Sequence, residues 1–213
     1  MTPQDQSKFA RGLAAHAPII PVLVIEDLAH AVPLARALVA GGLPVLEVTL
    51  RSACALDAIA AMSEVEGGIV GAGTILTPAD MKAAKAAGAR FAVSPGATDR
   101  VLAAAEDEAL PLLPGAVTAS EVMALYERGY DMLKFFPAEA VGGAPALKSI
   151  GGPIPQVAFC PTGGISLANA QSYLSLSNVL CAGGSWVAPK AAMAAGDWEA
   201  ITSLAREAAA LPR

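Results

Sequence analysis

The sequence predicts an α/β protein, and specifically one closed (β/α)8 barrel (a TIM barrel) formed by a single domain over residues 1–213. First, single barrels of this kind commonly need about 200 to 250 residues. Second, hydrophobic residues make up 54% of the chain and charged residues 15%, which suits strands that are buried on both faces. Third, short apolar runs alternate with alanine-rich segments of helical period, a pattern typical of repeated βα units.

Eight apolar runs are candidate parallel strands, and a segment with helical periodicity follows each of them. No long crossover suggests the reversal of strand order that a doubly wound sheet requires, so the barrel is favoured over that alternative. The predicted strands are Ile19–Ile25, Val45–Leu50, Ile69–Ile75, Arg90–Ser94, Leu110–Pro114, Met132–Phe136, Gln156–Pro161 and Val179–Ala182.

The helical segments carry start and stop signals. Thr77 with Asp80, and Thr118 with Glu121, have the spacing of a capping box, in which a threonine caps a helix and an acidic third residue caps the threonine in return. Glycines are expected in the left-handed conformation where helices end. These glycines are Gly41, Gly88, Gly129 and Gly196.

Charge and cysteine content exclude several classes of function. The net charge of −5 and a pI near 5.0 provide no basic field for nucleic acid or an anionic membrane surface. Neither an unbroken run of about 18 apolar residues nor a secretory signal is present, so we expect a cytoplasmic protein. The three cysteines favour reduced thiols, with Cys160 and Cys181 as packing residues. His16 and His30 are isolated, and we expect neither metal nor cofactor.

Charged residues inside two predicted strands are the candidate catalytic groups. Side chains alternate along a strand, so Glu47, Thr49 and Arg51 share one face, and Lys134 lies on the face opposite Leu133. We expect both polar faces to point into the barrel. Burial favours the neutral amine that attacks a carbonyl carbon, which is Schiff-base chemistry.

The remaining groups on these strands have roles that suit this chemistry. Glu47 suits proton transfer, and the planar guanidinium of Arg51 suits a substrate carboxylate. The alternatives are a purely structural Lys134–Glu47 ion pair and an ordinary surface arginine at position 51. Buried ion pairs seldom add net stability, which favours the catalytic interpretation.

Glycine-rich segments lie at the end of the third predicted strand and after the seventh and eighth. The loops after strands seven and eight bind phosphate in many barrels, through backbone N–H groups that glycine leaves accessible. Gly163 and Gly164 follow one strand, and Gly184 with Ser185 follow the other. Thr74, beside the glycines of the third segment, is a candidate substrate contact. The sequence therefore predicts a phosphorylated small-molecule substrate.

The chain resembles the 2-keto-3-deoxy-6-phosphogluconate (KDPG) aldolases, a family that includes 4-hydroxy-2-oxoglutarate (KHG) aldolase activity. The resemblance covers nearly the whole chain. The residues that carry it are Ile20–Leu23, Glu47–Arg51, Gly71–Thr74, Phe91–Gly96, Lys134–Ala138 and Pro161–Ile165.

The resemblance implies a role for each candidate residue. Lys134 would form the imine with substrate, Glu47 would relay protons through water, and Arg51 and Thr74 would hold the pyruvyl end. Phosphate would bind at Gly163, Gly164, Gly184 and Ser185, while Pro95, Phe136 and Thr162 complete the substrate-binding set. Thr162 would favour the gluconate over the galactonate epimer, since galactonate-specific relatives tend to carry an aliphatic residue there.

The resemblance also implies a metal-independent lyase, usually a homotrimer, that releases pyruvate and glyceraldehyde 3-phosphate in the Entner–Doudoroff route. Three alternatives remain open. The chain could act on the galactonate epimer, it could isomerise or decarboxylate a sugar phosphate without covalent catalysis, or it could be a non-catalytic phosphosugar sensor.

Overall fold

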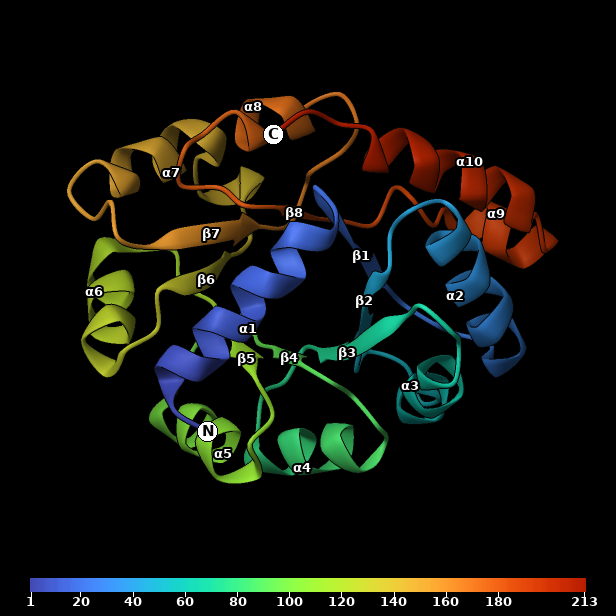
Figure 1. The fold of residues 1–213 in the computed structure, drawn as a ribbon, viewed down its shortest axis with the longest axis horizontal. Helices are drawn as coiled ribbons and strands as arrows, with labels where there is room; N and C mark the ends of the chain where they lie inside the picture. Colours follow the sequence, from blue (N-terminus) through green and yellow to red (C-terminus); the bar gives the residue numbers. More distant parts are fainter.

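The computed structural model describes residues 1–213 as parallel strands surrounded by helices (Figure 1). The strands are β1 (Ile19–Leu23), β2 (Val45–Thr49), β3 (Ile69–Gly73), β4 (Ala92–Val93), β5 (Leu112–Leu113), β6 (Met132–Phe135), β7 (Ala158–Pro161) and β8 (Ala182–Gly184). The α-helices are α1 (Pro3–His16), α2 (Ala31–Ala40), α3 (Ala55–Ser63), α4 (Pro78–Ala86), α5 (Asp99–Glu108), α6 (Ala119–Arg128), α7 (Gly143–Gly151), α8 (Ala170–Leu174), α9 (Lys190–Ala195) and α10 (Trp198–Ala209). Two short 3₁₀ helices are η1 (Leu28–His30) and η2 (Glu139–Val141).

The strands form two parallel sheets. Six strands pair in the order β5-β4-β3-β2-β1-β8, and β6 pairs with β7. Isolated parallel bridges connect the sheet edges, joining Gly115 to Lys134, Thr162 to Gly183 and Phe159 to Val179. The predicted α/β class with parallel strands is thereby confirmed. No helix is long and apolar enough to cross a membrane.

The predicted strands lie in the correct order, but several ends differ. Only Ala92–Val93 of the predicted fourth strand pairs regularly, and only Leu112–Leu113 of the fifth. The start of the eighth strand was wrong: Val179 forms just one bridge, and regular pairing with β1 begins where Ile19 meets Ala182. The run beginning at Val179 is apolar because it packs in the core, which hydrophobicity does not distinguish from strand pairing.

The helix signals were mostly correct. Both capping boxes form, at Thr77 with Asp80 and at Thr118 with Glu121. Gly88, Gly129 and Gly196 have positive φ as expected. Gly41 does not: its φ is −81°, and the next residue, Gly42, adopts the left-handed conformation at φ 92°. Helix α2 therefore ends one residue later than the glycine pattern predicted.

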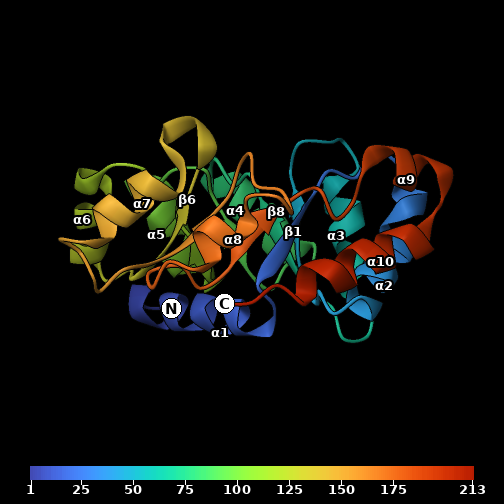
Figure 2. The same ribbon diagram turned by 90° about the horizontal axis from the view of Figure 1, so that it is seen from above.

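A helix that was not predicted, α1, closes one end of the strands (Figure 2). The Gln6 side-chain oxygen accepts hydrogen bonds from the Leu112 N–H at 3.0 Å and from the Tyr130 hydroxyl at 3.2 Å. The Ser7 hydroxyl accepts one from the Asp131 N–H at 3.0 Å. These partners lie where β5 and β6 begin, so α1 covers the N-terminal ends of the strands. A ligand therefore has access from the opposite end.

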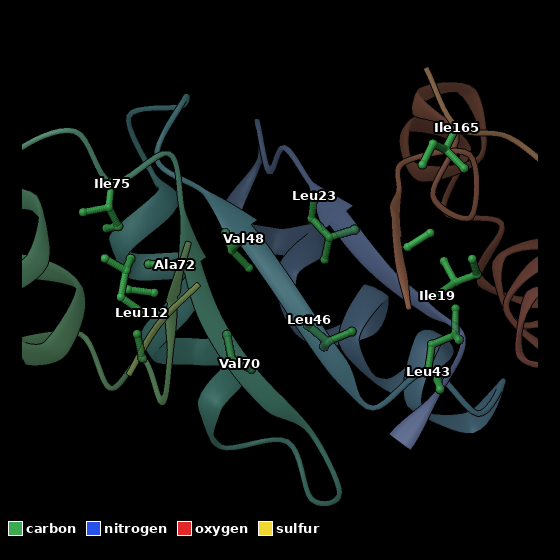
Figure 3. Packing of buried hydrophobic residues seen from close by; sticks show 14 of the residues in the cluster. Ile19, Leu23, Leu43, Leu46, Val48, Val70, Ala72, Ile75, Leu112 and Ile165 are labelled. Atoms are coloured by element: carbon green, nitrogen blue, oxygen red, sulfur yellow. The ribbon is translucent and has the colours of Figure 1, made fainter. Parts of the chain in front are cut away.

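Side-chain alternation separates the buried residues into two layers. Leu46 and Val48 of β2 lie beside Val70 and Ala72 of β3 in the cluster between the strands and the helices (Figure 3). Residues of the other parity, including Val45, Met132, Cys160 and Cys181, form a second apolar cluster with α1. Cys160 and Cys181 are free and buried, which confirms them as packing residues.

Candidate active site

Lys134 and Glu47 meet inside the strand assembly, as the parity of β2 and β6 predicts. The Lys134 Nζ lies 3.1 Å from the Glu47 Oε1, although the two residues are 87 positions apart in the chain. Their side chains are only 7% and 5% exposed. Leu133 and Phe135, on either side of Lys134, pack instead in the cluster under the helices. The predicted inward orientation of both charged groups is confirmed.

Two neighbours shape the space around this pair. The Phe136 ring lies beside the amine, with its centroid 5.3 Å from the Lys134 Nζ, close enough for a cation–π contact. A Cβ added to Gly73 would stand 2.2 Å from the Glu47 Oε1, so β3 leaves room for the carboxylate only because this position is glycine. The carboxylate can therefore exchange a proton directly with the lysine in a site with little water.

Thr49 and Arg51 continue the polar face of β2 beyond Glu47. The buried Thr49 hydroxyl donates to the Leu23 carbonyl at 2.7 Å and accepts from the Arg51 Nε at 3.1 Å. Arg51 itself is exposed, and no carboxylate pairs with it. Its remaining guanidinium nitrogens are free to bind an anion. Strand parity predicts Thr49 on this face but gives it no role, and its hydrogen bond to the Arg51 Nε orients the guanidinium.

Thr74 and Pro95 follow β3 and β4 at the same end of the strands. Thr74 has φ 64°, an uncommon value for a residue with a branched side chain, directly after the glycine that faces Glu47. The Pro95 carbonyl lies against Gly115, where a Cβ would stand 2.2 Å from this oxygen. Neither residue forms a hydrogen bond to Lys134 or Glu47, so the structure places both at the rim without joining them to the pair.

The loop after β7 presents unpaired backbone N–H groups. Its carbonyls are engaged: the Thr162, Gly163 and Gly164 oxygens accept hydrogen bonds at 2.8, 3.1 and 3.1 Å. By contrast, the N–H groups of Gly163, Gly164 and Ile165 donate to nothing in the chain. Consecutive free N–H groups of this kind bind anions.

The loop after β8 has the same character. The Ser185 N–H donates no hydrogen bond, and the Ser185 side chain is exposed. Gly184 packs so closely that an added Cβ would stand 1.9 Å from the Trp186 ring. Thr162 bridges to Gly183, so the two glycine-rich loops lie side by side. The arrangement can hold a phosphate group through main-chain donors.

Thr162 lies between the reacting pair and these loops. Its hydroxyl is buried and has no hydrogen-bond partner in the chain. It points towards β8, since a Cβ added to Gly183 would stand 2.3 Å from the Thr162 Oγ1. A buried hydroxyl without a partner costs free energy, so this one is suited to a substrate hydroxyl. No cluster of three or more histidine, cysteine, aspartate or glutamate residues could hold a metal ion.

The buried amine and carboxylate, with two loops of unpaired N–H groups beside them, form an arrangement typical of enzymes that use a lysine to act on phosphorylated carbonyl compounds. Comparison with known proteins agrees. The profile of the KDPG and KHG aldolases matches residues 12–204. A KHG/KDPG aldolase of Escherichia coli is 54% identical over 200 residues, which cover 93% of this chain and 94% of that protein.

Solved structures are equally similar. A KDPG aldolase of Zymomonas mobilis, crystallised with 3-phosphoglycerate, superposes with a TM-score of 0.92 at 50% identity, covering 97% of this chain and 98% of the other. The KDPG aldolase of Legionella pneumophila, with pyruvate captured as a covalent carbinolamine, gives 0.91 at 47% identity over 94% and 98%. The chain belongs to the KDPG and KHG aldolase family, and it is a lyase.

Proposed function

We propose that this protein cleaves 2-keto-3-deoxy-6-phosphogluconate to pyruvate and glyceraldehyde 3-phosphate through a Schiff base on Lys134. The observation that carries the proposal is the buried Lys134–Glu47 contact of 3.1 Å inside the strand assembly. It is supported by 54% identity over 97% of the chain to the 2-dehydro-3-deoxy-phosphogluconate aldolase of Pseudoalteromonas atlantica, because that name describes the same substrate.

The first half of the reaction forms the imine. Glu47 accepts a proton from the Lys134 ammonium, and the neutral amine then attacks the C2 ketone of the substrate. Glu47 then returns its proton to the hydroxyl of the resulting carbinolamine, which leaves as water and gives a protonated imine, with Glu47 again a carboxylate. The covalent carbinolamine with pyruvate in the Legionella pneumophila relative supports this step, since it is the intermediate expected before dehydration.

The second half breaks the C3–C4 bond. Glu47, directly or through a water molecule, removes the proton of the C4 hydroxyl, and the C3–C4 electron pair moves into the protonated imine. The C4 fragment leaves as the aldehyde, and the three-carbon fragment remains on Lys134 as an enamine. Protonation at C3 and hydrolysis of the imine then release pyruvate and restore the amine.

The other candidate residues would bind the two ends of the substrate. Arg51, held by Thr49, and Thr74 would contact the carboxylate at C1. Pro95 and Phe136 would line the pyruvyl pocket, where Phe136 already lies beside the amine. The set proposed for phosphate is Gly163, Gly164, Gly184 and Ser185, supported by the unpaired N–H groups of the loop after β7 and of Ser185.

Two observations support the gluconate epimer as the preferred substrate: the Thr162 hydroxyl and the sequence identity to known relatives. The unpartnered Thr162 hydroxyl suits the C4 hydroxyl of the gluconate epimer. Sequence identity supports that epimer as well, because a protein described as KDPGal is 26% identical, whereas the KDPG aldolases of Zymomonas mobilis and Pseudoalteromonas atlantica are 50% and 54% identical. We propose cleavage of 4-hydroxy-2-oxoglutarate as a secondary activity, because the Escherichia coli relative carries both names.

The wider architecture is part of the proposal. The bridges from Gly115 to Lys134 and from Thr162 to Gly183 support closure of the two sheets into one eight-stranded barrel, and so one domain over residues 1–213. A homotrimer acting in the cytoplasm, in the Entner–Doudoroff route, is what the family resemblance implies.

Cleavage is tested by a coupled assay in which lactate dehydrogenase reduces the released pyruvate. Purified protein is offered the phosphorylated gluconate and galactonate epimers and 4-hydroxy-2-oxoglutarate. We expect the highest kcat/KM with the gluconate epimer. Ligand-dependent stabilisation without pyruvate release would identify a sensor instead, and turnover without pyruvate would favour an isomerase.

A further inference from the structure

A hydrogen bond between Glu139 and Tyr173 lies behind the loop after β7. Glu139 begins η2, just after the lysine strand, and its Oε1 accepts a hydrogen bond from the Tyr173 hydroxyl on α8. Tyr173 is fully buried. Burial, and then the Glu139 carboxylate, raise the pKa of Tyr173, so that its hydroxyl remains a donor at any working pH.

This pair packs directly against the predicted phosphate loop. A Cβ added to Gly164 would stand 2.6 Å from the Glu139 Cγ and 2.7 Å from its Cβ. The Glu139 N–H also donates to the Gly163 carbonyl at 3.1 Å. Gly143 approaches from the other side, where an added Cβ would meet the Tyr173 hydroxyl at 3.4 Å. The Glu139 side chain is therefore a fixed surface on which the loop lies.

The loop is also held at its far end. The Asn169 Nδ2 donates to the Gly164 carbonyl at 3.1 Å, and its Oδ1 accepts from the Ser166 N–H at 2.8 Å. In a trans peptide the carbonyl and the following N–H point in opposite directions. Fixing the Gly163 carbonyl therefore aims the Gly164 N–H, and fixing the Gly164 carbonyl aims the Ile165 N–H, away from these partners.

We propose that Glu139 and Tyr173 are positioning residues that hold the Gly163–Gly164 loop with its N–H groups directed at the substrate phosphate, and thereby set the preference for phosphorylated substrates. The proposal rests on the proposed function, because it requires a phosphate in this loop. Neither side chain touches the reacting atoms. The carboxylate is turned towards Tyr173, so the loop amides, and not Glu139, face the anion.

The test compares phosphorylated and unphosphorylated substrates. Tyr173→Phe and Glu139→Ala each remove the Glu139–Tyr173 hydrogen bond behind the loop but keep the Glu139 N–H that binds the Gly163 carbonyl. The loop then loses its fixed support, so we expect KM for 2-keto-3-deoxy-6-phosphogluconate to rise about tenfold. We expect kcat to stay within about twofold, and KM for 4-hydroxy-2-oxoglutarate to be unchanged, since that substrate carries no phosphate. A merely structural role would change both substrates alike.

Two matched variants sharpen the test. Glu139→Gln keeps an oxygen that accepts from Tyr173, so its KM for the phosphorylated substrate should stay near the wild-type value. Tyr130→Phe removes another buried hydroxyl, which bonds to Gln6 at the closed end of the strands, and should leave both KM values unchanged. Glu139 is exposed, so Glu139→Ala keeps the proposal testable even where Tyr173→Phe fails to fold.

Inorganic phosphate is an independent probe. Its inhibition constant against 4-hydroxy-2-oxoglutarate cleavage should rise in Tyr173→Phe and Glu139→Ala in parallel with the KM change. Equal KM values for wild type and both variants would overturn the positioning role. The positioning role would also be overturned by a wild-type enzyme that has the same KM for the phosphorylated and the unphosphorylated substrate. That result would contradict phosphate binding in this loop. Absence of all pyruvate release would instead contradict the proposed function itself.

Discussion

The two ends of the candidate site use different parts of the polypeptide. At the reacting end, the side chains of Lys134 and Glu47 project from regular strands and meet at 3.1 Å with almost no exposure. At the phosphate end, the groups available are backbone N–H groups of glycine loops, held from behind by Glu139 and Asn169. We infer that the chemistry depends on side chains, whereas recognition of the substrate phosphate depends on main-chain geometry.

This separation predicts that variants at the reacting end affect every substrate, and the largest effect is expected at Lys134. Lys134→Ala removes the nucleophile, so kcat/KM should fall on the order of 10⁴-fold or more for both phosphorylated and unphosphorylated substrates. The coupled pyruvate assay measures it. Lys148→Ala, which removes an exposed lysine of α7, is the matched control.

Lys134→Ala also leaves the Glu47 carboxylate buried without its partner, which lowers stability. Circular dichroism and thermal unfolding must therefore show folded protein in the assay. Substantial cleavage by a folded Lys134→Ala variant would rule out the Schiff-base mechanism.

Glu47→Gln should have the second largest effect. The amide retains the shape and a hydrogen bond to Lys134 but does not accept protons, so kcat should fall on the order of 10²-fold for both substrates. Imine formation with pyruvate should continue at a reduced rate. Rapid-quench measurement of imine and product separates the two steps. An unchanged kcat would show that another group carries the proton.

A smaller and selective effect is expected at the phosphate end. Gly164 has φ 78°, and an added Cβ would meet Glu139 at 2.6 Å, so Gly164→Ala must displace the loop. KM for the phosphorylated substrate should rise about tenfold or more, with little change for 4-hydroxy-2-oxoglutarate. An equal loss with both substrates would break the proposed separation. Gly196→Ala, also at a left-handed glycine but after α9, is the control for strain alone.

The smallest effect should be on stability alone. Glu121 caps α6, and the N–H groups of Val117 and Thr118 hold the pKa of its carboxyl below the usual value. Glu121→Ala should lower the free energy of unfolding by about 1 kcal/mol at pH 7 without changing kcat or KM. Because the folded-state pKa is lowered, this difference should be complete above the unfolded-state pKa and disappear as pH falls through the folded-state value.

Urea denaturation of wild type and Glu121→Ala at pH 7 and at pH 3 measures this difference. If the free energies of unfolding of wild type and Glu121→Ala differed equally at pH 7 and pH 3, the charge of Glu121 would contribute nothing to stability. Reduced turnover in the variant would show that α6 affects the position of Lys134 in the strand that follows it.

The reacting end could be predicted from the sequence because strands have a strict period of two. A charge in an apolar strand has only two possible faces, so Lys134 and Glu47 could be placed inside before any tertiary contact was known. The capping boxes were equally accessible, because Thr77 and Asp80 interact locally along the chain. The closed (β/α)8 barrel is a finer prediction, for which the bridges from Lys134 and Thr162 are the supporting observations.

The phosphate end and the closed end could be predicted only in part. Glycine pairs marked the loops, but the direction of their N–H groups depends on Glu139 and Tyr173, which are 34 positions apart. The position of helix α1 was not predicted, because it depends on a hydrogen bond between Gln6 and the N–H of Leu112, the first residue of β5, which is 106 positions away in the chain. Periodicity reports which face a residue occupies, whereas such long-range hydrogen bonds depend on how the elements assemble.

Borohydride reduction in the presence of pyruvate tests whether Lys134 forms the imine. The imine is reduced to a stable amine, and intact-mass and peptide mass spectrometry then identify the modified lysine. We predict a single adduct on Lys134 that is absent from Lys134→Ala. An unmodified wild-type chain, or an adduct on another lysine with Lys134 unchanged, would contradict it.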